Sequence, residues 1–284
     1  MKQATVIILA GQSNAVGVGH AAYLSRHFSP EKVAEFRAGY PQVPIHYYSH
    51  DKQSGGFVPT GLGCTELTQD TLGPEVGMAE RLIELSPDSE FFIVKCAVGG
   101  TSLWRDWLSP SCGGDYDPEA CVESPEAAVH AVINGLPLRA GWCYNQMIKL
   151  TRESLDILIG RGYEPVIRGF CWMQGEADAC DPATLLPYGE RYHHLIRDFA
   201  AAVAPYAAGC IFVDGGISEV WPLYREMNAV KAAYAASHDD CRYLDTIAHG
   251  LTTRNEPEGA VDVYHYDCGS IVELGRMFAE AVLG

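Results

Sequence analysis

The chain has 284 residues, of which 48% are hydrophobic and 20% are charged. It therefore carries enough apolar material for a large core and shows no bias toward disorder. The formal net charge of −16 and the pI near 4.9 argue against nucleic acid or an anionic membrane as partner, because phosphate binding needs clustered Lys and Arg. A neutral ligand is compatible with this charge.

The N-terminal segment predicts a buried strand rather than a targeting signal. Its apolar run, 4–10, is too short to span a membrane, and a polar Gly-Gln-Ser-Asn turn follows without a small-residue cleavage site. We therefore expect a cytoplasmic protein. The alternative is an exported protein whose signal segment is not part of this sequence.

The ten cysteines do not have the spacing of a disulfide scaffold. Several lie in apolar runs, where a thiol behaves as a small buried hydrophobe. Cys112 and Cys121 flank an acidic loop and are the pair we would expect to join in an oxidising compartment. The sequence has no CxxC pair, so we expect reduced thiols and no structural zinc site.

Short apolar runs alternate with segments of helical periodicity. The runs are nearly continuous in apolar residues, as expected of parallel strands covered on both faces; they are 5–9, 45–49, 91–96, 166–173 and 210–213, with 242–245 as a weaker sixth. The expected helices are 74–85, 141–159, 185–203, 223–236 and 269–283.

This alternation predicts βαβ units with right-handed crossovers, which place helices on both faces of a sheet. The expected fold is α/β, a three-layer α/β/α sandwich around a mainly parallel five-stranded sheet. No repeat or linker interrupts the chain, so we expect one domain over 1–284. The long loops 41–71 and 109–137 are expected to form walls of a binding site.

Residues suited to acyl transfer follow the predicted strands. Ligands of open α/β sheets bind beyond the carboxyl ends of the strands, and a serine nucleophile needs a base, an orienting acid and oxyanion donors. Each feature has a plainer interpretation, such as a helix N-cap for Ser13 or a simple turn for a Gly-Gly pair. Together they include a hydroxyl, a glycine pair, an amide with a carboxylate, and an Asp/His pair: Ser13, Gly99-Gly100, Gln174 with Glu176, and Asp262 with His265.

These segments resemble the sialate O-acetylesterase-like domain of the SGNH-hydrolase superfamily, which overlaps the sixth family of carbohydrate esterases. The resemblance covers the whole chain and implies an SGNH/flavodoxin-like fold. It is carried by Gly11-Gln12-Ser13-Asn14, Ala97-Val98-Gly99-Gly100-Thr101, Trp172-Met173-Gln174-Gly175-Glu176-Ala177-Asp178 and Asp262-x-x-His265.

The resemblance implies a carbohydrate O-acetylesterase with Ser13 as nucleophile and His265 as general base. It also implies an oxyanion hole formed by the backbone N–H of Ser13, the N–H of Gly100 or Gly99, and the Gln174 amide. In the wider superfamily an Asn stands where this chain has Gln174. Such an esterase uses no metal and no organic cofactor.

The acid that orients His265 is left open between two residues. Asp262 is the first candidate because it lies three residues before the histidine. Glu176 is the competitor, because it stands in a matching segment after a neighbouring strand. Its plainer role is to hold the Gln174 loop in shape.

The expected partner is a small carbohydrate ester, such as acetylxylan or an O-acetylated sialic acid, with no nucleic acid or membrane partner; the oligomeric state is open. Candidate substrate contacts are Gln12, Asn14, Trp104 and Arg105. The alternatives are a short-chain lipase or thioesterase on the same fold and a non-catalytic carbohydrate-binding protein. A nucleotide-binding loop at 11–19 is excluded, because its Gly-Lys-Ser/Thr ending is absent.

Overall fold

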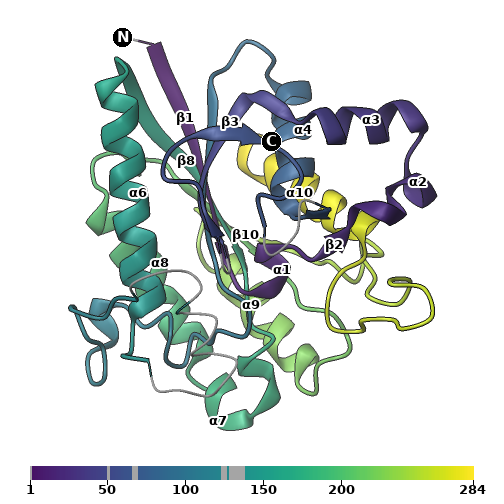
Figure 1. Cartoon of the computed structure of the whole chain (residues 1–284). Helices are drawn as coiled ribbons and strands as arrows, with labels where there is room; N and C mark the ends of the chain where they lie inside the picture. The colour runs from purple at the N-terminus through teal and green to yellow at the C-terminus, as the bar shows by residue number, and fades with distance from the viewer. Residues whose placement is uncertain (1, 50–51, 66–69, 123–126, 128–137) are drawn as a thin grey trace.

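The computed structural model describes the whole chain except residues 1, 50–51, 66–69, 123–126 and 128–137. It shows the expected α/β fold, in which a mainly parallel sheet lies between two helical layers (Figure 1). Part of the predicted loop 109–137 lies outside the described residues.

As far as the described residues show, the central sheet has eight strands in the order β10-β9-β8-β1-β7-β3-β4, with β5 also paired to β3. The six strands from β10 to β3 in this order are mutually parallel, whereas β4 and β5 run antiparallel to β3. Their bounds are β1 Lys2–Gly11, β3 Tyr40–Ser49, β4 Lys52–Gln53, β5 Val58–Thr60, β7 Phe91–Ala97, β8 Tyr163–Met173, β9 Ile211–Gly215 and β10 Cys241–Leu244.

The mainly parallel sheet is confirmed, but the expected count of five strands is too low. The weak sixth strand is present as β10, and two short strands lie in the segment 41–71 that was expected to be loop. This segment also contains β6, Thr71–Leu72, which pairs with β2, Gly19–His20, outside the main sheet. The added strands have only two or three residues and include a Pro, so they lack the apolar run that reveals a central strand.

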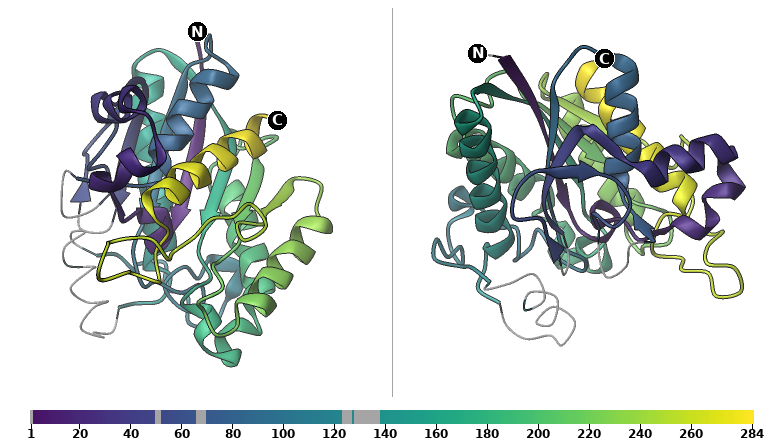
Figure 2. Two further views of the ribbon diagram at one scale, coloured as in Figure 1. Left: turned by 90° about the vertical axis from the view of Figure 1, so that its right-hand side faces the viewer. Right: turned by 45° about the horizontal axis from the view of Figure 1, so that its top comes forward.

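Within the described part of the chain, five longer helices cover the two faces of the sheet. One layer contains α6 (Trp142–Gly160), α8 (Tyr188–Ala202) and α9 (Tyr224–Ala236), and the other contains α4 (Pro74–Leu85) and α10 (Cys268–Leu283) (Figure 2). The shorter helices are α1 Ser13–Val16, α2 Leu24–His27, α3 Pro30–Ala38 and α7 Pro182–Leu185, with 3-10 turns at Ala21–Tyr23, Pro110–Cys112 and Asp178–Cys180. Among the described residues, the helices fall short of the length and apolarity that crossing a bilayer requires.

Helices α4 and α10 touch through their backbones. A Cβ atom added at Gly77 would lie 1.9 Å from the carbonyl oxygen of Val272, and one at Gly275 would lie 1.9 Å from that of Pro74. Only glycine allows such an approach. Helices α4 and α10 are thereby packed against each other at the backbone-to-backbone distance that only these glycines permit.

The parallel strands all end at one edge of the sheet, which we call the reaction edge. The segments that follow β1, β7 and β8 meet there because β1 lies between the other two strands: Gly11 is opposite Ala97 on one side and Met173 on the other. Both chain ends lie at the opposite edge (Figure 1).

All ten cysteines are free thiols. The pair considered for an oxidising compartment, Cys112 and Cys121, is therefore unbridged in the structure. Most of the thiols are buried in the core, as expected for small apolar side chains.

Candidate active site

Ser13 begins the short helix α1 directly after the central strand β1 and is half-buried. The turn before it depends on Gly11, which has φ 143°, and a Cβ there would lie 2.0 Å from the Met173 carbonyl oxygen. The Gln12 N–H donates to that same oxygen over 2.9 Å. The sharp strand-to-helix turn thus places the Ser13 hydroxyl at the reaction edge.

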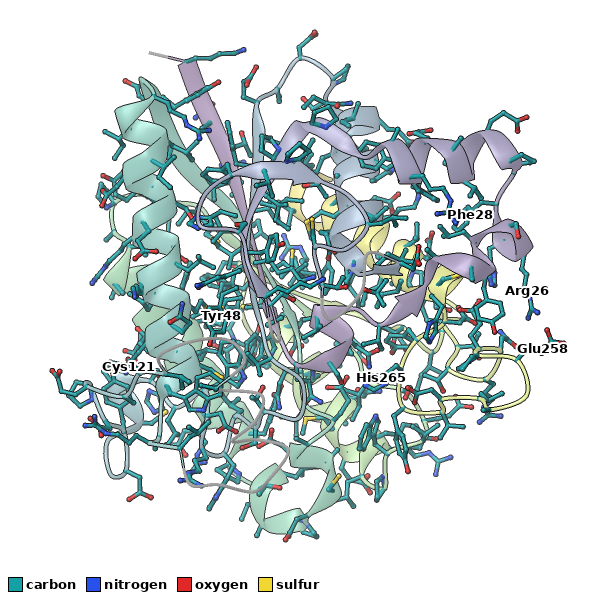
Figure 3. The ribbon with its side chains drawn as sticks, viewed as in Figure 1. Arg26, Phe28, Tyr48, Cys121, Glu258 and His265 are labelled. Atoms are coloured by element: carbon teal, nitrogen blue, oxygen red, sulfur yellow. The ribbon has the colours of Figure 1, made fainter. Side chains whose placement is uncertain are left out.

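His265 lies in the loop between β10 and α10, beside α1 (Figure 3). Its Nδ1 lies 2.6 Å from Oδ2 of Asp262, and the side chains are 26% and 39% exposed. Asp262 also accepts the Tyr264 N–H over 3.0 Å. Partial burial opposes ionisation of Asp262, but these hydrogen bonds hold its pKa below the ordinary value.

This pairing sets the protonation of the imidazole ring. The Asp262 carboxylate accepts a hydrogen from Nδ1, so in the neutral ring the lone pair resides on Nε2. A base needs a lone pair on the side that faces its proton donor. The Asp262–His265 pair therefore has the arrangement of a general base and its orienting acid.

Asn14 connects α1 to the His265 loop. Its Oδ1 accepts the backbone N–H of Tyr266 over 3.0 Å, and its Nδ2 donates to Oε1 of Glu176 over 2.9 Å. A longer contact of 3.5 Å joins Nδ2 to the Tyr264 carbonyl oxygen, and the side chain is only 1% exposed, so these bonds are shielded from water. Asn14 is the chain neighbour of Ser13, and Tyr266 is the chain neighbour of His265. The hydrogen bond between Asn14 and Tyr266 therefore holds Ser13 and His265 in the same part of the site.

Glu176 is fully buried, and its hydrogen-bond partner is Asn14. Burial raises its pKa above the ordinary value, and the bond from Asn14 opposes this only in part. Of the two candidate acids, the structure pairs Asp262 with His265 and places Glu176 behind Asn14.

The glycine pair follows β7 at the same edge. Gly99 is half-buried and Gly100 is exposed with φ 74°, a conformation that favours glycine. The turn is anchored by Thr101, whose hydroxyl donates to the Val98 carbonyl over 2.7 Å and accepts from Trp107 Nε1 over 2.9 Å. This turn flanks Ser13 on the side opposite to β8.

Gln174 follows β8 on the other side, but its amide is used inside the protein. The side chain is fully buried, and Nε2 lies 2.6 Å from Asp178 Oδ2, 3.2 Å from Gln12 Oε1 and 3.2 Å from the Thr101 carbonyl oxygen. Three acceptors face the two amide hydrogens, so none remains for a substrate oxygen. The oxyanion-donor role expected for Gln174 is therefore wrong for this geometry, and Gln174 is a positioning residue.

Asp178 completes this framework and was missed in the sequence. Besides Gln174, its carboxylate accepts the backbone N–H groups of Leu103 and Trp104, each over 2.9 Å. Burial raises its pKa to about 6. Asp178 thus ties the segment after β7 to the segment after β8. Its position two residues after Glu176 in the third matching block was the one signal that could have revealed it.

Lys231 on α9 is a second framework residue that sequence reasoning missed. Its ammonium group is buried and donates to Asp214 Oδ1 over 2.7 Å, to the Gly215 carbonyl over 2.8 Å and to the Gln174 carbonyl. It therefore holds the backbone of Gln174 from behind. The sequence alone does not reveal which loop a buried lysine on a helix contacts.

Two expected substrate contacts need correction. Gln12 and Asn14 are 2% and 1% exposed, and their side chains bond to Gln174, Ala177, Glu176 and Tyr266. A side chain that is buried and satisfied within the protein has no surface left for a sugar. Both residues therefore belong to the framework of the site.

Trp104 and Arg105 lie near this framework. Trp104 is 42% exposed and stacks under Arg191 at 4.0 Å, while Arg105 donates to the Leu138 carbonyl. Both line a cavity of about 430 Å³ together with Leu108, Asp115, Leu138, Arg139 and Ala140. Sequence reasoning missed an aromatic pair: Tyr264, the chain neighbour of His265, is 53% exposed and packs on the half-buried Trp221 with ring centroids 5.3 Å apart.

Solved structures with the same fold include a protein from Arabidopsis thaliana, with 19% identity, TM-score 0.63 and coverage of 100% of this chain and 98% of that chain. NanS has 16% identity, TM-score 0.69 and coverage of 99% and 97%. A carbohydrate acetylesterase from Xanthomonas citri has 17% identity and TM-score 0.61; the match covers 98% of this chain and 55% of that one.

A comparison with curated proteins gave no match. Residues 3–284 match the family described as "Carbohydrate esterase, sialic acid-specific acetylesterase". This match spans almost the entire chain, including every residue of the site described above. The chain therefore belongs to the carbohydrate esterase, sialic acid-specific acetylesterase family.

Proposed function

We propose that this protein is a serine esterase that hydrolyses acetyl esters on a carbohydrate through an acetyl-serine intermediate. The observation that carries the proposal is the Asp262–His265 pair, whose loop Asn14 fixes beside Ser13. A nucleophile, a base in the correct tautomer and an orienting acid are what acyl transfer by serine requires. Family membership supports the carbohydrate ester as substrate.

In the proposed mechanism, Nε2 of His265 takes the hydroxyl proton as Ser13 Oγ attacks the acetyl carbonyl. The carbonyl π electrons move to its oxygen, and Asp262 stabilises the imidazolium that forms. When the tetrahedral intermediate collapses, the C–O bond to the sugar breaks and His265 gives its proton to the departing sugar oxygen. A water, deprotonated by His265, then hydrolyses the acetyl-Ser13 ester, releasing acetate and restoring the serine.

The negative charge of each tetrahedral intermediate needs hydrogen-bond donors. We assign this role to the backbone N–H of Ser13 at the start of α1 and to that of Gly100 or Gly99. Gln174 and Asp178 contribute indirectly, because they tie the glycine turn to the segment after β8. Preorganised donors of this kind cost no rearrangement when the charge develops.

The alcohol side of the site is suited to a sugar. Tyr264, the exposed neighbour of His265 in the chain, is supported from behind by the half-buried Trp221, and aromatic rings stack on the apolar faces of sugar rings. A net charge of −16 favours a neutral glycan such as acetylxylan over an anionic sialic acid in long-range attraction. The alternatives on the same fold are a short-chain lipase or thioesterase and a non-catalytic carbohydrate-binding protein.

The first test is Ser13→Ala, assayed for acetate release from acetylated xylo-oligosaccharides, O-acetyl sialic acid and p-nitrophenyl acetate. We expect turnover to fall by roughly three or more orders of magnitude while the fold is kept, because only the nucleophile is lost. The matched control is Ser25→Ala, which removes an exposed hydroxyl on α2. More than a tenth of wild-type activity in Ser13→Ala would overturn the nucleophile assignment, and no activity in the wild type would favour the binding protein.

A further inference from the structure

A second group of reactive side chains lies outside the esterase site, where the loop that carries His265 meets α10. It consists of His27 at the end of α2, Glu256 in the loop and Cys268 at the start of α10. One ligand atom from each lies within 4.8 Å of the others. The Glu256 and Cys268 side chains are buried, and His27 is 29% exposed.

The three side chains converge on one oxygen atom. Oε1 of Glu256 lies 3.1 Å from His27 Nε2 and 3.2 Å from Cys268 Sγ. Ligands at ordinary zinc distances in a tetrahedron are about 3.3–3.6 Å apart. Two of the three ligand-to-ligand distances are therefore already close to those that a zinc ion would impose, and the third pair, His27 Nε2 and Cys268 Sγ, lies within 4.8 Å. The partly exposed His27 side chain lets solvent reach the cluster, so the fourth ligand would be water.

The surroundings orient these groups as the second shell of a metal site does. The other carboxylate oxygen of Glu256, Oε2, accepts the Cys268 N–H over 2.8 Å, which fixes the direction of Oε1. This bond is not needed to cap α10, because Asp267 already caps it by accepting the Ser270 N–H over 2.8 Å. The imidazole of His27 lies flat on the first turn of α10, where a Cβ on Gly269 would come within 2.6 Å of Nδ1.

We propose that His27, Glu256 and Cys268 form a binding site for a divalent transition metal of the zinc type. A thiol, an imidazole and a carboxylate form a donor set that suits zinc, whereas calcium and magnesium prefer oxygen ligands alone. Binding replaces the thiol hydrogen: the Cys268 S–H proton leaves to solvent, the sulfur bonds to the metal as thiolate, and neutral His27 gives the Nε2 lone pair.

The position of this site links it to the loop of the esterase site. Two of its three ligands, Glu256 and Cys268, lie at the two ends of segment 257–267, which contains both Asp262 and His265. The backbone also closes this segment, because the Asp262 N–H donates to the Glu256 carbonyl over 2.9 Å. A metal bound at the base of the segment would therefore restrain it without touching a substrate. Figure 3 places this corner of the fold near the labelled Arg26 and Glu258, which form an ion pair.

The test uses the full chain after removal of metals with a chelator, and the probes are Zn²⁺ alone and Co²⁺ alone. We expect one strongly bound Co²⁺ per chain, with visible bands of tetrahedral cobalt and a thiolate-to-cobalt charge-transfer band that Zn²⁺ abolishes. His27→Ala and Cys268→Ser should each weaken binding at least about 10- to 100-fold, since even outer-shell partners are worth that much. Cys268→Ser should also remove the charge-transfer band.

The matched controls are His249→Ala, an exposed histidine in another part of the C-terminal region, and Cys180→Ser, an exposed thiol. Both should bind as the wild type does. His27 lies on the surface, so its variant keeps the test valid if Cys268→Ser fails to fold. In the wild type, Zn²⁺ should slow amide hydrogen exchange in segment 257–267, and in His27→Ala it should not. Absent binding, or binding that both ligand variants retain, overturns the proposal whatever the esterase assays show.

Discussion

The Asn14 side chain donates a hydrogen bond to the buried carboxylate of Glu176 over 2.9 Å. The same side chain accepts the N–H of Tyr266, so Glu176 acts on the His265 loop through Asn14 rather than by contact with the imidazole. The Asn14 amide thus stands between the Glu176 carboxylate and the loop that carries His265. The two acids that the sequence left open should consequently respond very differently to mutation.

We expect Asp262→Asn to lower kcat by roughly 10³- to 10⁴-fold, because an amide at this position favours the wrong imidazole tautomer. Glu176→Gln keeps an oxygen that can accept from Asn14. Its cost should be about 1 kcal/mol, which is less than a tenfold loss. Initial rates with p-nitrophenyl acetate measure both variants. The opposite ranking would give Glu176 the orienting role.

Acyl specificity follows from the framework around the glycine turn. Bonds from Asp178 and Gln174 tie the segment Thr101 to Trp104 to the segment after β8, and we expect this framework to exclude a long acyl chain beside Ser13. Each methylene that cannot be buried forgoes about 0.8 kcal/mol. We expect kcat/KM on p-nitrophenyl esters to fall steeply from acetate to butyrate and to be negligible for octanoate. Equal activity on octanoate would favour the lipase interpretation.

The backbone contact between α4 and α10 predicts an unequal response of two helical glycines. Gly275→Ala places a methyl group against the Pro74 carbonyl and should destabilise the protein by about 1–3 kcal/mol. Gly160→Ala, at the end of α6, meets open space and should stabilise it by up to about 1 kcal/mol, because alanine has fewer unfolded conformations. Urea denaturation measures both. A similar midpoint for the two variants would contradict the tight crossing.

The raised pKa of Asp178 predicts how stability depends on pH. Folded Asp178 keeps its proton up to about pH 6, whereas the unfolded chain releases it near the ordinary value of 3.8. Between these two pKa values the folded state binds more protons than the unfolded state. The free energy of unfolding of the wild type therefore falls as the pH rises from about 4 to about 6. Relative to Asp178→Asn, the loss of unfolding free energy should be about 2 kcal/mol between pH 4 and pH 7. Denaturation curves of both proteins at several pH values measure the difference between their free energies of unfolding. A difference that does not change with pH would show that burial does not raise the pKa of Asp178.

Much of the central fold is visible in the sequence because local patterns determine it. Helix α4 (Pro74–Leu85) matches its expected bounds, and β7 was expected over 91–96 and observed as Phe91–Ala97. A buried parallel strand needs a continuous apolar run, and a surface helix needs a periodic one. Strands β4 and β5 carry neither pattern. They are strands only because their backbones pair with β3.

The site was predictable in its positions but not in its hydrogen bonds. Strand order brings the segments after β1, β7 and β8 together, so the sequence could indicate Ser13, the glycine turn and Gln174. Which acceptor faces the Gln174 amide depends on Asp178 and on backbone placement, and no local pattern encodes either. Trp104 and Trp107 show the same limit, since one is 42% exposed and the other is fully buried only three residues later.

The two chain ends lie at the edge of the sheet opposite the segments that follow β1, β7 and β8 (Figure 2). A tether joined to either end would therefore extend away from the side on which we expect the substrate to approach. Immobilisation on a bead, or fusion to a module that grips cellulose or xylan, should leave the hydrolytic side facing outward.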